Sequence, residues 1–314
     1  MSEPIRRADA LAYGQTDAEL RSLYTRQGWS KLRPGLYVPP EFEELTREAK
    51  HRELVVATAP LLSALASISH QSAAVMHDVP LWSVPFDRVH ATRDRPAGGR
   101  KTRHLHMHCA PLPDEDVVVI DGVRVTDLAR TVCDLARTVP LEQAIVAGDA
   151  AMRKGLTRNE IVDGLAYAEG RHGFRRAQLA TQLFDGRSES VGESRSRLAL
   201  SQLRLPTPQL QTEFFDNAGV LLGRGDFFIE EFGVIGEFDG KVKYGKYLRP
   251  GVSPGEAVYR EKLREDSLRD MGWEVVRWIW SELERRDVIH ARFQRAITRR
   301  KHAQRPLGTY RLAA

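Results

Sequence analysis

Residues 224–245, RGDFFIEEFGVIGEFDGKVKYG, place charged side chains within an otherwise apolar strand pattern. Side chains alternate across a strand, so Glu237, Asp239 and Lys241 are expected on one face. If EEFG forms the turn of a hairpin, Asp226 on the first strand lies opposite Glu237 in one register and opposite Asp239 in the next even register. Either register gathers the carboxylates on one face of a sheet.

Carboxylates that face each other across a hairpin repel, because directly opposed Cβ atoms lie about 5 Å apart. A shared proton, an arginine such as Arg224, or a divalent cation would offset this repulsion. Oxygen ligands at a polar strand end suit Mg²⁺ or Mn²⁺ far better than zinc. A lysine two residues beyond the second acid could polarise a water molecule or stabilise charge on a phosphate. The alternative is a solvated sheet edge whose charges form salt bridges only.

The flanking residues predict the rest of a third region, 186–314, which follows a polar break at DGRSESVG. A helix is expected from about Glu193 to Leu203, and strands are expected at LQTEFFD, VLLGRGDFFI and GVIGEFDGKVKY. The helix GEAVYREKLREDSLRDMG, the strand WEVVRWIW and a basic helix complete the region. This order predicts an α/β arrangement with a mixed sheet flanked by helices.

The spacing from Asp226 to Glu237-Phe-Asp239-Gly-Lys241 resembles the PD-(D/E)XK nuclease superfamily. GRGDFFI, EFDG and REDSLRDMGWEVVRW are closest to the branch related to very-short-patch repair endonucleases. The resemblance implies a restriction-endonuclease-like fold and a Mg²⁺- or Mn²⁺-dependent DNA endonuclease. In that family the acids, here Asp226, Glu237 and Asp239, hold the metal, and a glutamate on the first helix, here Glu193, often assists.

The resemblance covers roughly residues 185–285. It departs from the family's pattern where GRGD replaces the proline of the motif's name. The literal acid-x-Lys is Asp239-Gly240-Lys241, but the family's spacing also allows Glu237 as the principal ligand. We expect both acids to contribute. Nuclease folds also serve as inert scaffolds, so a non-enzymatic role stays open.

Residues 1–40 have the order of a winged helix-turn-helix. TDAELRSLYTRQG begins with a capping box at Thr16 and Glu19, and WSKLRPGLYVPP predicts a hairpin turned at Pro34-Gly35. RQGWSKLRPGLYV resembles the winged-helix module of AbiEi-type antitoxins. The resemblance implies promoter DNA binding, a repressor function and a partner toxin. The side chains it implies for DNA contact are Arg21, Arg26, Lys31 and Arg33.

Residues 41–185 predict a mixed, mostly helical middle region, where SHQSAAVMHDVPLW and VTDLARTVCDLAR also resemble AbiEi-like proteins. Two sets of histidines could suggest a metal, namely His70 with His77, and His104, His106 and His108. Neither has the paired spacing of a zinc site, and neighbours on one strand are expected to splay apart, so polar surface or capping roles are predicted.

The helical segment LARTVCDLARTV, with the aspartate before it, carries alternating charges. Asp127, Arg130, Asp134 and Arg137 fall on one helical face, which predicts a structural ion-pair ladder.

The 314-residue composition is that of a globular multidomain chain, and we assign it to the α/β class in the broad sense, with α+β domains. The net charge is +5, and residues 285–314 carry nine Arg or Lys against one Asp, which favours a polyanionic partner. Two cysteines and the absence of an apolar leader or membrane-length segment predict a cytoplasmic protein.

Overall fold

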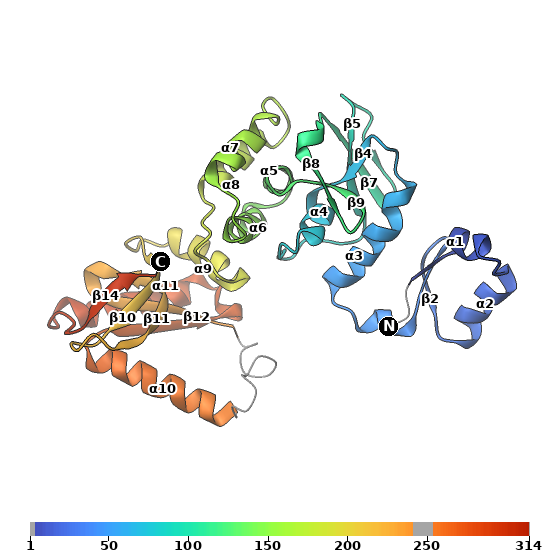
Figure 1. Cartoon of the computed structure of the whole chain (residues 1–314). Coiled ribbons are helices and arrows are strands. Elements are labelled where there is room, and N and C mark those ends of the chain that lie inside the picture. The colour runs from blue at the N-terminus through green and yellow to red at the C-terminus, as the bar shows by residue number, and fades with distance from the viewer. Residues whose placement is uncertain (1–3, 241–253, 314) are drawn as a thin grey trace. The chain divides into compact units, whose positions relative to one another are not determined.

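The computed structural model describes residues 4–240 and 254–313, and the chain forms two compact units, Met1–Phe184 and Asp185–Ala314. Helices and strands are combined in both units (Figure 1), which confirms the broad α/β class. None of the described helices has the length and apolar character needed to cross a membrane.

The first forty residues form a small three-stranded sheet with two helices, and they belong to the same unit as the middle region. The elements are β1 (Ile5–Arg6), α1 (Arg7–Ala12), α2 (Asp17–Arg26), β2 (Ser30–Arg33) and β3 (Leu36–Val38), in the sheet order β1-β3-β2. The capping box is present, since Thr16 Oγ1 accepts from the Glu19 amide at 3.2 Å and the Thr16 amide donates to Glu19 Oε2 at 2.7 Å. The hairpin turns at Gly35, whose φ is +78°.

The middle region is built on a six-stranded sheet of order β6-β7-β5-β4-β9-β8. Its strands are β4 (Ala66–Ile68), β5 (Val89–Asp94), β6 (Arg100–Lys101), β7 (Leu105–Ala110), β8 (Val117–Ile120) and β9 (Val123–Thr126). Its helices are α3 (Arg47–Thr58), α4 (His70–Met76), α5 (Leu128–Thr138), α6 (Leu141–Arg153), α7 (Arg158–Ala166) and α8 (Phe174–Gln182). The sequence of residues 46–66 has a helical pattern that Pro60 could break, and the break is present. There the chain leaves α3 before Pro60 and Ile68 is buried between β5 and β9.

The C-terminal unit has a five-stranded sheet of order β13-β12-β11-β10-β14, in which β12 and β13 are parallel and the other pairs are antiparallel. Its elements are α9 (Val191–Ser201), β10 (Gln209–Phe215), β11 (Leu221–Ile229), β12 (Val234–Asp239), α10 (Pro254–Asp270), β13 (Glu274–Ile279), α11 (Arg286–Lys301) and β14 (Thr309–Leu312). Strand β14 lies within the basic stretch 285–314, where the sequence predicted a helix and no strand.

Helices cover both faces of this sheet. Phe238 of β12 packs in one core with residues of α9 and α11, whereas Ile235 packs in a second core with Leu268 of α10. Glu237 therefore shares the α10 face with Ile235, as strand alternation requires. The fold places the predicted acidic strand in the middle of a covered sheet and not at an open edge.

Candidate functional site

The predicted hairpin has the first of the two expected registers. Phe227 pairs with Gly236 and Ile229 with Val234, which puts Asp226 in register with Glu237 and not with Asp239. The backbone pairing ends at Phe227 and Gly236, so the strands separate as they reach the acids. In the space between them, Asp226 Oδ2 accepts a hydrogen bond of 2.9 Å from the Phe238 amide.

Strand alternation is interrupted at Asp226. A Cβ on Gly225 would meet Ile235 on the α10 face, yet Phe227, two residues on, packs in the core with α9 and α11. Alternation alone therefore does not fix the face of Asp226, and its position on the face of Glu237 stays a prediction. Irregular strand positions commonly re-aim a side chain next to a functional site.

Glu193 lies in the first turn of α9 and reaches the neighbouring strand. Its carboxylate accepts from Ser190 Oγ at 2.7 Å, from the Glu189 amide at 2.8 Å and from Gln211 Nε2 at 2.8 Å. Gln211 stands opposite Asp226, between the pairs that join β10 to β11, and has a φ of +51°. The positive φ is unfavourable for glutamine. Sequence analysis missed Gln211 because nothing in a polar residue of a strand signals an unusual backbone conformation.

Glu237 is engaged by two arginines from distant elements. Arg264 Nη2 of α10 donates to its two oxygens at 2.7 and 2.9 Å, and Arg277 Nε of β13 donates to Oε2 at 2.8 Å. Burial alone would lower the pKa of Arg264, but its contacts with Glu261 and Glu237 raise it. Arg224, the arginine first considered for this role, instead contacts Glu189 at 2.6 Å.

The predicted residues are therefore only partly brought together. Asp226 reaches the backbone beside Asp239, whose half-buried carboxylate makes no hydrogen bond or ion pair within residues 4–240 and 254–313. Across those same residues, Asp226, Glu237 and Asp239 do not form a set whose ligand atoms all lie within 4.8 Å of one another. Lys241 lies outside the described residues. The oxygen-only donors still suit Mg²⁺ or Mn²⁺, and the metal site remains a prediction.

The four side chains predicted to contact DNA divide into two groups. Arg21 and Arg26 of α2 and Lys31 of β2 are exposed. Arg33 instead donates to Thr58 Oγ1 at 2.8 Å and to the Ala57 carbonyl at 3.1 Å, which ties β2 to α3. The exposed cations can contact phosphates without rearrangement, whereas Arg33 would first have to break its hydrogen bonds to α3.

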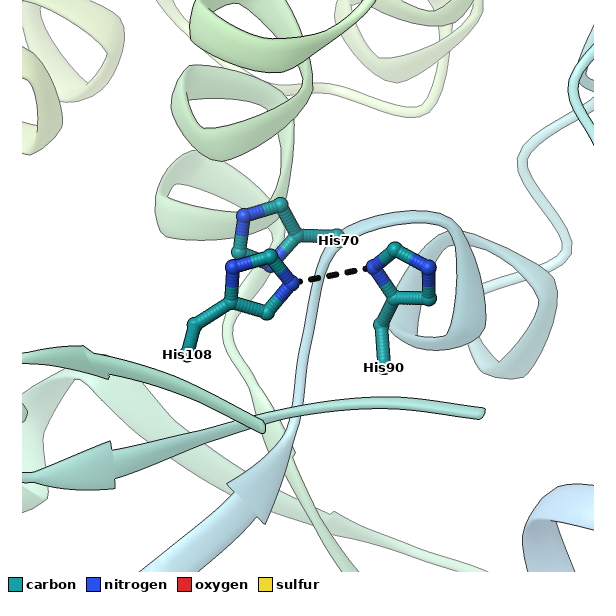
Figure 2. A group of neighbouring side chains, drawn as sticks. All are labelled: His70, His90 and His108. Carbon is teal, nitrogen blue, oxygen red and sulfur yellow. Dashed lines mark hydrogen bonds between the residues drawn. The ribbon is translucent and has the colours of Figure 1, made fainter. Parts of the chain in front are cut away.

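The histidines of the middle region are closer together than the sequence suggested. Ring nitrogens of His70, His90 and His108 all lie within 4.8 Å of one another (Figure 2). His70 is buried, so a surface role is wrong for it. His77, expected on the same helical face, turns away to the Thr126 carbonyl at 2.8 Å. The missing partner was His90, which β5 supplies from a different strand.

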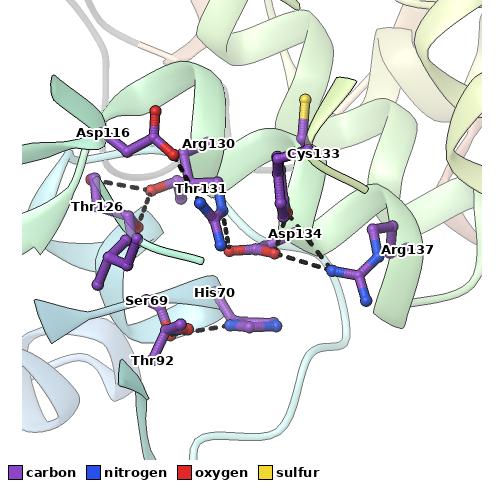
Figure 3. A network of polar contacts seen from close by, with 12 residues as sticks. Ser69, His70, Thr92, Asp116, Thr126, Arg130, Thr131, Cys133, Asp134 and Arg137 are labelled. Atoms are coloured by element: carbon purple, nitrogen blue, oxygen red, sulfur yellow. Dashed lines mark hydrogen bonds and ion pairs between the residues drawn. The ribbon is translucent and has the colours of Figure 1, made fainter. Parts of the chain in front are cut away.

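The predicted ion-pair ladder on α5 is a buried network (Figure 3). Asp134 accepts from Arg130 Nε at 3.2 Å and from Arg137 Nη1 at 3.2 Å, and both Arg130 and Asp134 are 1% exposed. Asp127 is not part of the ladder: it caps α5 by accepting from the Arg130 amide at 2.6 Å. Asp116 takes its place as the second acid, 2.6 Å from Arg130.

Comparison with known proteins finds that the chain is similar to proteins of Mycobacterium tuberculosis. No family model matches it. Two proteins of Mycobacterium tuberculosis, Uncharacterized protein MT2308 and Uncharacterized protein Rv2248, are each 28% identical over 186 residues, 59% of this chain and 65% of theirs. The chain thus spans less than two thirds of the length of these relatives. The crystal structure of the RV2827C protein from Mycobacterium tuberculosis is similar with a TM-score of 0.38 and 15% identity, over 58% of this chain and 72% of that one.

Proposed function

We propose that this chain is a DNA-binding protein whose C-terminal unit is a Mg²⁺- or Mn²⁺-dependent DNA endonuclease. The observation that carries the proposal is the position of Asp226. Its carboxylate holds the Phe238 amide where β11 and β12 separate, next to the backbone of Asp239. Two acids on neighbouring strands, both near one gap in the sheet, offer the oxygen donors that a hard divalent cation needs.

The residues have distinct roles in this proposal. Asp226 and Asp239 would hold the cation, and Glu193, fixed against Gln211, would orient a water molecule. Glu237 keeps the end of β12 in place, because its two oxygens are already engaged by arginines. Bound Mg²⁺ would supply Lewis acidity toward a phosphodiester. Lys241, two residues after Asp239 in the sequence, would stabilise negative charge on the phosphate.

A plasmid cleavage assay tests this proposal. Purified protein is incubated with supercoiled DNA and Mg²⁺ or Mn²⁺, with and without a chelator. Asp226→Asn and Asp239→Asn are expected to lower the nicking rate by about 100-fold or more, the order found when a transition-state contact is removed. The matched control is Glu231→Gln, an exposed acid in the turn after β11. Absence of nicking by the unaltered protein, or equal nicking by Asp239→Asn, would overturn the proposal.

The second candidate is a non-enzymatic repressor and antitoxin that binds operator DNA and a toxin partner. The exposure of Arg21, Arg26 and Lys31 favours it, because these cations need no rearrangement to meet phosphates. Replacing all three by alanine should weaken DNA binding and reduce the salt slope by about 2.7, from about 0.9 for each lost phosphate contact. If the triple-alanine variant shifts DNA in a gel as the unaltered protein does, this surface is not the DNA-binding surface. Strong binding without cleavage, together with a co-purifying toxin, would favour the repressor over the nuclease.

A further inference from the structure

We propose that His70, His90 and His108 form a transition-metal site, best suited to Zn²⁺, with a fourth coordination position that opens into a cavity of about 510 Å³. The three ligands come from the start of α4, from β5 and from β7 (Figure 2). The site lies in the N-terminal unit and is independent of the proposed nuclease centre.

The geometry is close to what zinc requires. Zn–N bonds of about 2.0–2.1 Å in a tetrahedron place neighbouring nitrogens about 3.3–3.4 Å apart. His90 Nδ1 and His108 Nε2 already face each other at 3.0 Å, and a nitrogen of His70 lies within 4.8 Å of them. The His70 ring now stacks on His108 at 3.8 Å, and it would have to rotate out of this stack to bring the three nitrogens around one ion.

Metal-binding imidazoles must be neutral, and burial of these rings disfavours the charged form. Burial lowers the pKa of His90 and of His108 to about 2, and it lowers the pKa of His70 well below its usual value. Without a metal, one of the two facing nitrogens must carry a proton to make the 3.0 Å contact. A bound ion would replace that proton.

Two of the rings already contact neighbouring polar side chains. His70 Nδ1 is 2.9 Å from Ser69 Oγ, which in turn accepts from Thr92 Oγ1 at 2.8 Å (Figure 3). Gln71 Nε2 is 2.7 Å from His90 Nε2, and because a His90 bound to metal through Nδ1 carries its proton on Nε2, the Gln71 amide would turn its oxygen toward the ring to accept from it. Hydrogen bonds of this kind fix the orientation of metal-bound histidines. His70 also has a φ of +54°, an unfavourable backbone conformation of the type that concentrates at functional sites.

The surroundings favour an exchangeable fourth ligand that is water or a small anion. The cavity is lined by the three histidines, by His106 and by the cations Lys101 and Arg176. The adjoining buried network places Arg130 and Arg137 with Asp116 and Asp134, so two positive and two negative charges balance. Arg88 and Arg137 also line the cavity, together with Asp87, so its wall is positively charged and favours an anion as the fourth ligand of the ion.

Cobalt spectroscopy and metal binding test the site. Untagged full-length protein is stripped with a chelator and titrated with Co²⁺ and then with Zn²⁺. We expect one equivalent of Co²⁺ with the visible absorption of a tetrahedral site, displaced by Zn²⁺. His90→Gln and His108→Gln should each weaken binding by more than about 100-fold, beyond the loss seen for outer-shell changes. His104→Gln, on the residue before β7, is the matched control and should bind like the unaltered protein.

A second measurement needs no variant. X-ray absorption of the zinc-loaded protein should show three imidazoles at about 2.0 Å and one ligand that is not an imidazole. Three results would each overturn the proposal. The unaltered protein could fail to bind one equivalent of metal, His90→Gln and His108→Gln could bind metal as tightly as the unaltered protein, or the zinc shell could lack three imidazoles. The histidines would then be a packed, metal-free stack, consistent with the 3.8 Å separation of the His70 and His108 rings.

Discussion

Glu237 gives the sharpest test of how the acidic strand is used. It is 8% exposed, and Glu237→Gln removes the charge on which Arg264 and Arg277 converge while keeping the size of the side chain. Leaving a charge without its buried partner costs about 3–5 kcal/mol. Here the side chains of the two arginines are 21% and 31% exposed, and both also contact Glu261. These features reduce the expected loss of unfolding free energy to about 2–3 kcal/mol.

The loss should be visible by calorimetry of the full chain. For a unit of roughly 130 residues, about 4 °C is lost per kcal/mol, so the transition of the C-terminal unit should fall by about 8–12 °C. Glu231→Gln is the control, because an exposed substitution changes stability by less than about 0.5 kcal/mol. In a double-mutant cycle, Glu237→Gln and Arg264→Gln should be coupled by at least about 1 kcal/mol.

The same variant separates a structural from a metal-binding role. If Glu237 only holds the strand, Glu237→Gln keeps Mn²⁺ affinity within about threefold at a temperature where the protein is folded, and Asp239→Asn loses it. A Tm within 2 °C of the unaltered protein, combined with loss of Mn²⁺ binding, would refute this reasoning and restore Glu237 as a principal ligand.

Three further predictions concern stability. Asp134→Asn leaves the buried Arg130 short of a carboxylate, so urea unfolding of the N-terminal unit should show a loss of about 3–5 kcal/mol; a loss under 1 kcal/mol would contradict the network. Burial lowers the pKa of His51 to about 4, so its contribution is complete above its unfolded pKa of about 6.5 and is lost as the pH falls toward 4. His51→Gln should therefore remove about 1.4 kcal/mol per pH unit from the slope of stability between pH 6 and 5, and an unchanged slope would contradict it. Gly192→Ala places a methyl group 1.9 Å from Phe238 Cε1, and thermal melting should show about 1–3 kcal/mol of destabilisation; an unshifted melting curve would contradict this packing.

Local chemistry made much of the fold predictable. The Thr16 capping box, the turn at Gly35 and the hairpin of β11 and β12 follow from short-range patterns, and all three are present; of the two registers left open for that hairpin, the one that pairs Phe227 with Gly236 is found. Strand β4 was missed because three residues are too few to show a period of two.

The sites were harder to predict because their partners lie far apart in the sequence. Arg264 and Arg277 come 27 and 40 residues after Glu237, and no local spacing signals that they converge on it. The histidine cluster needed His90, whose position beside His108 depends on the parallel pairing of β5 with β7. Loop closure over such distances is decided by the whole fold, not by a window of sequence.

A crystal structure of the protein soaked in Mn²⁺ would test the proposed nuclease centre most directly. The proposal predicts an anomalous peak between Asp226 and Asp239, about 2.1 Å from a carboxylate oxygen of each. Glu237 should still be bound to Arg264 and Arg277 in the same crystal. A saturating soak that leaves no peak between the two aspartates, or a peak bound by Glu237 in place of Asp239, would contradict it.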